Sequence, residues 1–522
     1  MSKASFLTKA STTSLPAKPD QNILTAAKGG SIVFAGDVFQ QGVRLVAGYL
    51  LARLLGAEQL GLCNLALTVA SIAAGLALLG LPSAMVRYVP LFTSRQDTAR
   101  LWGTLQIGLG LTAIVSMLIG IGLFVLADPI AEQMFHEPEL APLLRVVSPI
   151  VPFLALCNTI AAATRGFKKM QYTVISQSIS QPTIRLILVV ALAAIVGLNA
   201  ATALATYNVS VIIAFVIVLY FLNTLFPLKR PLRAARRDTR ETLRFALPVY
   251  LSSLIGLFGG NVQTLLLGAL GTAANVGIFA VASQINIFGR IFHGSIVTTS
   301  APIVSELYGR GEREQMGRFY QTVTKWTFTV NLPLFLIVLL FPGPILSIFG
   351  QSFVGGATAL SILAWASLVQ TGTGICGLVI NMTGNTHLRL MNSLVTFVLT
   401  LGLNFLLIPR WGLVGTAVAA VASAIVMNAL RLLEVFILFR LLPYNSSFVK
   451  PIAAGLMALA AARGLRFLFP SEVTLIHVAM NVVVLLAVYV GTVLLLGLSQ
   501  EDRMVLTRLV QRVNNVFHSK EH

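Results

Sequence analysis

Long apolar runs alternate with short polar gaps from residue 31 to residue 498. Fourteen of the runs are long enough to cross a bilayer as a helix, which needs about 20 apolar residues. A spanning β-barrel would instead show alternating strands of about 10 residues. The pattern therefore predicts an all-α polytopic membrane protein with about 14 transmembrane helices. The expected spans are 31–54, 62–85, 102–126, 145–164, 173–196, 201–226, 245–268, 275–299, 322–341, 359–382, 390–408, 413–439, 450–469 and 474–498.

The basic residues fall mostly into every second gap between these runs. They occupy both terminal tails and the even-numbered gaps, and they are densest between Lys229 and Arg244. The odd-numbered gaps hold only a few, which are Arg53, Arg145, Arg410, Arg463 and Arg466. Cytoplasmic loops carry an excess of Lys and Arg, so the alternation predicts that both termini lie in the cytoplasm.

Two halves of the chain repeat one another. Leu60-Gly61-Leu62 at the start of the second span matches Val276-Gly277-Ile278 at the start of the eighth, with an offset of 216 residues. Leu91-Phe92 and Leu307-Tyr308, each before a basic loop, have the same offset. Six spans per repeat is an even number, so the repeats have the same orientation and are related by an axis along the membrane normal.

The repeat and the charge pattern divide the chain into six parts, with two parallel six-helix lobes and two further helices. The parts are a cytoplasmic tail (1–30), an N-terminal lobe (31–226), a basic cytoplasmic linker (227–244), a C-terminal lobe (245–440), two extra helices (441–498) and an amphipathic cytoplasmic tail (499–522).

Composition removes several other classes of protein. With 56% hydrophobic residues and 11% charged residues, the chain is not an ordinary soluble domain. The net charge of +19 comes from the basic loops, so we expect no nucleic-acid partner. Cys63, Cys157 and Cys376 lie in apolar stretches and form no disulfide or metal framework, and no cleaved signal peptide is expected.

The first span carries a polar stripe. Asp37, Gln40, Gln41 and Arg44 are spaced to share one helix face. Counting about 1.5 Å per residue places Arg44 near the middle of the membrane, where a charge costs on the order of 2.5–3.5 kcal/mol. The stripe is therefore expected to line a watery cavity. The alternative is a structural network in which Asp37 neutralises Arg44.

Other spans carry similar polar positions. Asn286 and Arg290 share a face of the eighth span, Arg185 lies in the fifth and Asn261 in the seventh. Three deep arginines with Asp37 as the one deep acid predict a cationic cavity, and guanidinium groups are suited to phosphate. Arg431 and Glu434, three residues apart, are interpreted as a self-paired couple near the cytoplasmic end rather than as a site.

No enzyme motif stands in a suitable context. Gly372, Gly374 and Gly377 match a dinucleotide fingerprint by spacing, but they lie inside an apolar span with no βαβ unit. We interpret them as close helix packing. The sequence therefore predicts neither an enzyme nor a metal or cofactor site.

Four stretches resemble the polysaccharide transporter, or oligosaccharide flippase, family of the multidrug/oligosaccharidyl-lipid/polysaccharide exporter superfamily. They are LLARLLGAEQLGLCNLAL (50–67), TLLLGALGTAANVGIFAVASQI (264–285), SELYGRGEREQMGRFYQ (305–321) and NFLLIPRWGLVGTAVAAVAS (404–423). With the fourteen spans, the resemblance covers nearly the whole chain. It implies two six-helix lobes around a central cavity that opens alternately to each side.

The resemblance also implies a function. Family members are thought to move polyprenyl-diphosphate-linked oligosaccharides, such as O-antigen or exopolysaccharide units, across the bacterial inner membrane. Expected partners are membrane lipid, this lipid-linked glycan and glycan polymerases. Arg44 and Arg290 lie on the helices whose cavity arginines matter in lipid II flippases. Asp37 is a candidate for coupling to a proton or sodium gradient.

Two alternatives stay open. A multidrug and toxin extrusion antiporter has the same fold, but it is expected to carry acidic cavity residues for cationic drugs. A membrane-embedded glycan polymerase or glycosyltransferase is expected to have large outward loops, and the longest outward gap, from Asp128 to Arg145, is short.

Overall fold

The structure is a computed structural model that describes residues 21–195, 197–228, 231, 235–468 and 475–497. The predicted amphipathic tail at 499–522 and the first 20 residues lie outside the described residues. Residues 21–30 already belong to the first helix, so this helix begins ten positions before the predicted span.

Helices make up the described part of the chain, which contains no strand. The elements of the N-terminal half are α1 (Gln21–Ala77), α2 (Leu81–Ser94), α3 (Thr98–Val125), α4 (Ala127–Pro129), η1 (Ile130–Met134), α5 (Leu140–Val147), α6 (Ile150–Gly166), α7 (Met170–Thr173), η2 (Val174–Ser180), α8 (Gln181–Ile195) and α9 (Ala200–Leu225). Those of the C-terminal half are α10 (Thr239–Leu270), α11 (Ala273–Gly309), α12 (Arg313–Leu340), α13 (Pro342–Phe349), η4 (Gln351–Gly356), α14 (Ala357–Thr373), α15 (Cys376–Met382), α16 (Thr386–Phe439), η5 (Ser446–Phe448), α17 (Val449–Leu468) and α18 (Leu475–Leu495).

Many of these helices are long and apolar enough to cross a membrane. Within the described residues there are ten, or twelve if each of two bent helix pairs forms one span. The all-α polytopic fold is thereby confirmed, whereas the number fourteen stays a prediction.

Two of the ten helices are long enough for two spans each. α1 has 57 residues and breaks at Gly56, and α16 has 54 residues and breaks at Gly412. Both glycines have positive φ values, 74° and 52°, which other residues rarely adopt. Counting residues 21–55, 57–77, 386–411 and 413–439 as separate spans would give the predicted fourteen.

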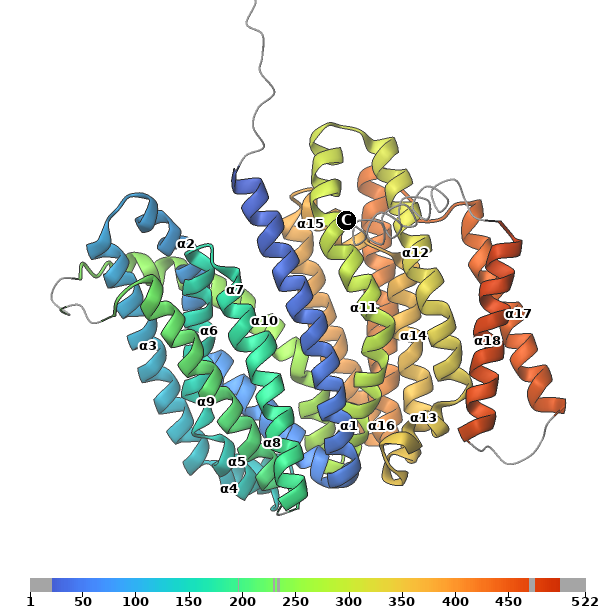
Figure 1. The fold of residues 1–522 in the computed structure, drawn as a ribbon, viewed down its shortest axis with the longest axis horizontal. Coiled ribbons are helices and arrows are strands. Elements are labelled where there is room, and N and C mark those ends of the chain that lie inside the picture. The colour runs from blue at the N-terminus through green and yellow to red at the C-terminus, as the bar shows by residue number, and fades with distance from the viewer. Residues whose placement is uncertain (1–20, 196, 229–230, 232–234, 469–474, 498–522) are drawn as a thin grey trace, which may run out of the picture.

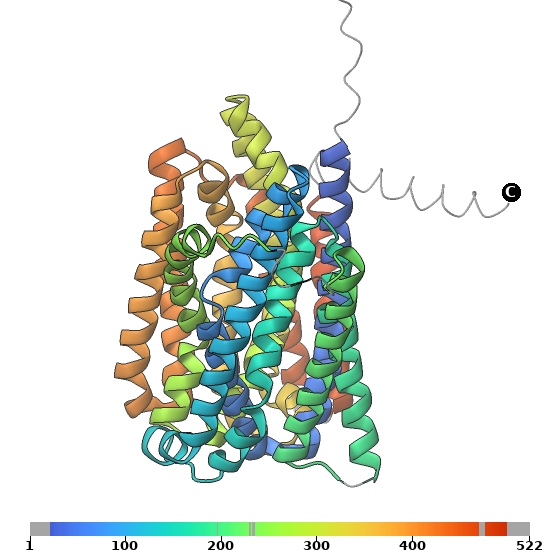
Figure 2. The ribbon, with the colours of Figure 1, turned by 90° about the vertical axis from the view of Figure 1, so that its left-hand side faces the viewer.

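The long helices lie side by side along a common direction (Figures 1 and 2). α2, α3, α6, α8 and α9 gather on one side, and α12, α14, α15 and α16 gather on the other. α1 and α11 meet in the middle and make the most extensive helix contact of the described residues. α17 and α18 pack on each other and, through α12, on the edge of the second group.

Two glycines of the sequence repeat meet where the halves cross. A methyl group on Gly61 would overlap the carbonyl oxygen of Ala273, and one on Gly277 would overlap the carbonyl oxygen of Ala57. The two contacts are reciprocal, and each pair is related by the same 216-residue offset. Only residues without a side chain let two helix backbones approach this closely. The repeat found in the sequence is therefore also a repeat in space.

Two hydrogen bonds lie beside this crossing, and their donors are related by the same internal repeat. The backbone N–H of Ala273, at the start of α11, donates to the Glu137 carboxylate at 2.9 Å. The N–H of Ala57, at the start of the second arm of α1, donates to the Ser352 hydroxyl at 3.3 Å. Each bond joins one half to the other. They satisfy donors that a helix start leaves free, and they lie toward the end of the bundle that holds α4 and α13 (Figure 1).

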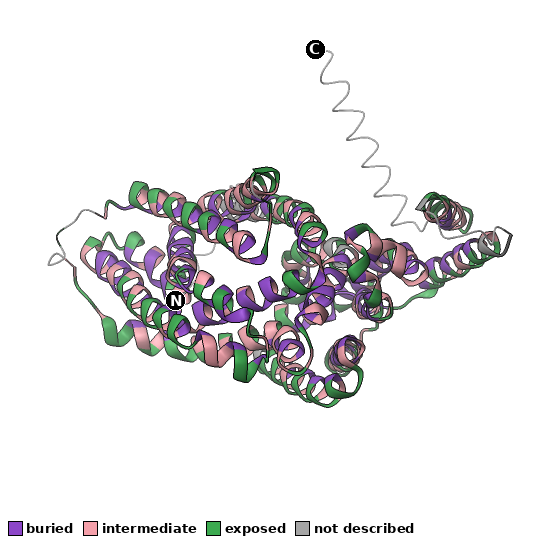
Figure 3. Cartoon of the chain, turned by 90° about the horizontal axis from the view of Figure 1, so that it is seen from below, coloured by how far each residue is buried: buried purple, intermediate pink, exposed green. Residues whose placement is uncertain are grey.

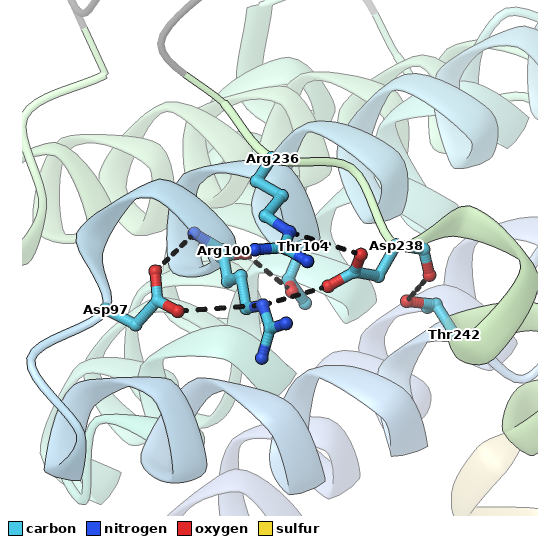
Figure 4. A network of polar contacts seen from close by, with 6 residues as sticks. All are labelled: Asp97, Arg100, Thr104, Arg236, Asp238 and Thr242. Atoms are coloured by element: carbon cyan, nitrogen blue, oxygen red, sulfur yellow. Dashed lines mark hydrogen bonds and ion pairs between the residues drawn. The ribbon is translucent and has the colours of Figure 1, made fainter.

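The basic linker is fastened to the N-terminal half. Arg100 forms ion pairs with Asp97 at 3.6 Å and with Asp238 at 3.2 Å (Figure 4). The N–H of Arg236 donates to the carbonyl oxygen of Ala99 at 3.0 Å. The start of α10 is therefore tied to the start of α3.

Burial follows the expectation for a membrane bundle. Buried residues gather inside the bundle, and its outer surface carries mostly exposed and intermediate residues (Figure 3). On α3 this outer surface is apolar, with Ile114, Leu118 and Val125 exposed by 61%, 64% and 67%. Apolar residues exposed along a long helix are suited to lipid, so the chain is a multi-pass membrane protein.

Candidate functional site: an arginine-lined cavity between the halves

A cavity of about 390 Å³ lies where α1, α8, α9 and α11 meet. It is lined by Gln41 and Arg44 of α1, Arg185 of α8, Tyr207 of α9 and Gln284 of α11, among others. Three residues predicted from the sequence, Gln41, Arg44 and Arg185, are thus brought together. Among the described residues that line it there is no Asp or Glu, so the cavity is cationic.

The side chain of Arg185, on α8, is positioned by Tyr207 of the neighbouring helix α9. Its guanidinium carbon lies 5.0 Å from the centre of the Tyr207 ring, within the range of a cation–π contact. Its Nε atom is buried and has no hydrogen-bond partner among the described residues. This N–H donor is therefore available to an anion, because no acid or carbonyl oxygen of the described residues accepts it.

Arg44 connects the two halves through its backbone. The side-chain amide of Gln284, on α11, donates to the Arg44 carbonyl oxygen at 3.0 Å. The Arg44 side chain itself is exposed and lines the cavity. A movement of α11 against α1 would therefore stretch or break this hydrogen bond and shift the helical turn that carries Arg44.

Asp37 lies in a different cavity from Arg44. This second cavity, of about 480 Å³, is lined by Phe34, Asp37 and Gln41 of α1 and by Ser295 and Thr298 of α11, among others. Among the ion pairs of the described residues, none joins Asp37 to Arg44. The geometry gives no support to the permanent ion pair considered from the sequence.

The remaining predicted residues lie elsewhere. The side-chain amide of Gln40 donates to the carbonyl oxygen of Gln177 at 3.0 Å, so Gln40 packs against the π-helical segment η2. Asn261 donates to Leu257 on its own helix at 2.8 Å. Asn286 lines a smaller cavity of about 180 Å³ with Asn331 and Ser367. Arg290 belongs to α11, and its side chain lies outside the described residues.

Sequence reasoning missed a second pair of arginines. Arg431 does not pair with Glu434 among the described ion pairs; instead the Glu434 carboxylate accepts a hydrogen bond from Asn392 at 2.8 Å. Arg431 and Arg389 line a further cavity in the C-terminal half. The sequence does contain a signal for this cavity, because Arg431 lies within an apolar run just as Arg44 does.

The predicted packing role of the glycine motif is only part of its role. Gly374 has a φ of 65°, and a methyl group there would overlap Thr324, which is close helix packing. Gly374 and Gly377 also line the cavity that holds Arg431. These glycines therefore shape a cavity wall.

Two bundles with a polar cavity at their interface, related by an internal repeat, form the architecture of a secondary transporter. The chain belongs to the polysaccharide biosynthesis protein family, whose model matches residues 26–308, and the MatE family model matches residues 248–406. It is thereby a member of the multidrug/oligosaccharidyl-lipid/polysaccharide exporter superfamily, as the sequence resemblance implied.

Two curated relatives and one solved structure illustrate the similarity. The chain is 26% identical over 39% of its length to the probable low-salt glycan biosynthesis flippase Agl15 of Haloferax volcanii, and the match spans 43% of that relative. It is 22% identical over 85% of its length to the stage V sporulation protein B of Bacillus subtilis, covering 90% of it. Its fold matches that of the lipid II flippase MurJ in an inward closed conformation, with a TM-score of 0.70 and 13% identity, and the match covers 88% of this chain and 98% of that one.

Proposed function

We propose that this protein flips a polyprenyl-diphosphate-linked oligosaccharide, an O-antigen or exopolysaccharide repeat unit, across the bacterial inner membrane. The carrying observation is the cavity at the interface of the two halves, with Arg44 and Arg185 in its lining and no acid among its described lining residues. Guanidinium groups bind phosphate oxygens through paired hydrogen bonds, so two arginines suit a diphosphate. The polyprenyl tail stays in lipid, and the flipped glycan passes to a glycan polymerase.

The mechanism follows from the two ends of the cavity. On one side the central cavity adjoins the wider cavity lined by Asp37 and Phe34, since both are lined by Gln41 and Ile287, and on the other side it is shut by the Gly61–Gly277 crossing. Cargo enters from the open end and its diphosphate reaches the arginines. Separation of the glycine crossing then opens the other end. No covalent bond changes in this cycle, so the protein is a transporter and not an enzyme.

The multidrug antiporter is the runner-up, because the MatE model matches residues 248–406. Cationic drugs need acids in the cavity, since a buried cation is stable only when it is paired. The two arginines of the central cavity would repel them.

A strain that lacks the protein tests the proposed function. It is expected to accumulate a polyprenyl-diphosphate-linked glycan on the cytoplasmic leaflet, measured by the access of a membrane-impermeant sugar-modifying reagent in inverted and right-side-out vesicles. Unchanged glycan levels on both leaflets, with no defect in surface polysaccharide, would contradict the proposal.

We propose that both termini and the linker lie in the cytoplasm. Reporter fusions after Arg165, Arg237 and Arg313 should therefore report cytoplasm, and fusions near Glu137 and Gly350 should report the outside. The bundle supports this arrangement, because α4 and α13 lie at the end opposite to the start of α1 (Figure 1). An outside signal at Arg237 would contradict it.

We propose that Asp37 couples transport to a proton or sodium gradient. It is exposed in the wider cavity and can take up a cation there. Asp37→Asn should abolish the dependence of flipping on the gradient at normal protein abundance. Glu58→Gln, which changes an exposed acid of the same helix, is the control and should leave it intact. Full gradient-driven transport by Asp37→Asn would exclude coupling through this residue.

A further inference from the structure

The C-terminal half holds a polar cavity of its own, of about 350 Å³, which is the one lined by Arg389 and Arg431. Its polar lining includes Gln370 of α14, Asn381 of α15 and Arg389, Ser393, Asn428 and Arg431 of α16. Among the described residues of this lining there is no Asp or Glu. The nearby acid Glu434 accepts a hydrogen bond from Asn392, and among the described residues it forms no ion pair with Arg389 or Arg431.

Arg431 packs beside Gly377. A methyl group on Gly377 would lie 3.6 Å from Nη1 of Arg431 and 3.8 Å from its guanidinium carbon, which is ordinary van der Waals contact, so the guanidinium lies next to this glycine. The packing places the side chain on the cavity wall. A charged group fixed at the wall of a water-filled cavity is a binding group for an ion of opposite sign.

The three cavities adjoin one another. Gln41 and Ile287 line both the central cavity and the wider one. His293, Gly294 and Gln370 line both the wider cavity and the one in the C-terminal half. The three cavities thus lie in a row from the N-terminal half to the C-terminal half, and we call this row the cleft. It has an arginine pair at each end, and Asp37 is the one acid among its described lining residues.

We infer that the C-terminal end of this cleft binds an anionic group on the glycan, so that the cargo is an acidic oligosaccharide. The inference rests on the proposed function. With the diphosphate at Arg44 and Arg185, the glycan extends along the cleft toward Arg389 and Arg431. A sugar carboxylate or a sugar phosphate supplies the matching charge, and the amides of Gln370, Asn381 and Asn428 match sugar hydroxyls.

A neutral glycan would leave these two arginines without an anion in a cleft that it has largely filled. Sites built for a charged or hydrogen-bonding group reject analogues that lack it, because the site's own polar groups then lose water without gaining a partner. The cleft is therefore expected to select against neutral cargo as well as to favour acidic cargo.

The test uses the purified full-length protein in phosphatidylcholine vesicles with two matched cargo lipids. Both are polyprenyl-diphosphate disaccharides, one ending in glucuronic acid and the other in glucose. The wild type should flip the acidic cargo about 10-fold faster, as expected for one charge-assisted contact. Arg431→Gln and Arg389→Gln should each bring this ratio close to one, and Arg431→Lys should keep part of it. Arg463→Gln, an exposed arginine of α17 that lines none of these cavities, is the control and should keep the whole ratio.

The ratio separates specificity from folding, because a misfolded variant loses both cargoes equally. A ratio near one in the wild type, or a ratio that Arg389→Gln and Arg431→Gln leave unchanged, overturns the inference while flipping of either cargo upholds the proposed function. Absence of flipping for both cargoes overturns the proposed function and the inference with it.

A third cargo ending in a sugar phosphate distinguishes phosphate from carboxylate. Loss of the ratio on adding phosphatidylglycerol would assign the site to a lipid headgroup and overturn the inference.

Discussion

Arg44→Ala and Arg185→Ala are each expected to reduce flipping of a polyprenyl-diphosphate glycan about 100-fold at normal protein abundance. Truncating one partner of a desolvated charge pair costs about 2–5 kcal/mol, which corresponds to such a factor. Both side chains line the central cavity, and Arg185 is held there by Tyr207. The Lys variants should retain part of the activity, because lysine keeps the charge and loses the two-pronged contact.

Arg53→Ala is the matched control for these variants. Arg53 is an exposed arginine on the same helix as Arg44, and it is not among the lining residues of the central cavity. Flipping and abundance are measured together, with abundance followed by a fluorescent fusion. If Arg44→Ala and Arg185→Ala flip cargo as fast as Arg53→Ala does, the arginines do not hold the diphosphate. Low abundance of Arg185→Ala alone would assign Arg185 to helix packing.

Gly61→Ala is expected to destabilise the protein and to open the end of the cleft that is closed in this structure. The new methyl group would overlap the Ala273 carbonyl oxygen, which is backbone and cannot move aside as a side chain does. Overpacking typically costs about 1–3 kcal/mol. The melting temperature in detergent should fall, and a cysteine introduced at Ser352 should react faster with an impermeant thiol reagent.

Gly42→Ala is the control, because nothing lies within 4 Å of the methyl group it would add. This substitution should be neutral or stabilising by up to about 1 kcal/mol, since alanine is the better helix former. Gly277→Ala should behave as Gly61→Ala does, because the two contacts are reciprocal. If the Gly61→Ala protein has the same melting temperature and the same thiol reactivity at position 352 as the Gly42→Ala protein, the crossing does not keep this end shut.

The sequence contained much of the fold. Apolar runs predicted the helices, and the 216-residue offset between Gly61 and Gly277 predicted that the halves repeat. It did not show the π-helical segment at Val174–Ser180, because a π turn depends on which neighbour takes the freed carbonyl oxygen. Here Gln40 donates to the carbonyl oxygen of Gln177.

The candidate site was predictable in part. Helical spacing shows which residues share a face, and it brought Gln41, Arg44 and Arg185 into one cavity. It does not show which neighbour that face meets, so Gln40 and Asn261 could not be distinguished from the cavity residues. Arg431 was overlooked because a nearby acid in the sequence suggested a pair, whereas Asn392 binds that acid in the fold.

The most direct measurement of the central claim is flipping by the purified protein in vesicles. A fluorescent polyprenyl-diphosphate oligosaccharide is incorporated in both leaflets, and a membrane-impermeant quencher is added outside. Protein-containing vesicles are predicted to lose nearly all of the fluorescence over time, whereas empty vesicles and vesicles with Arg44→Ala should lose about half, the share of cargo in the outer leaflet. Equal half-loss in wild-type and empty vesicles, under every ion gradient tested, would contradict the account.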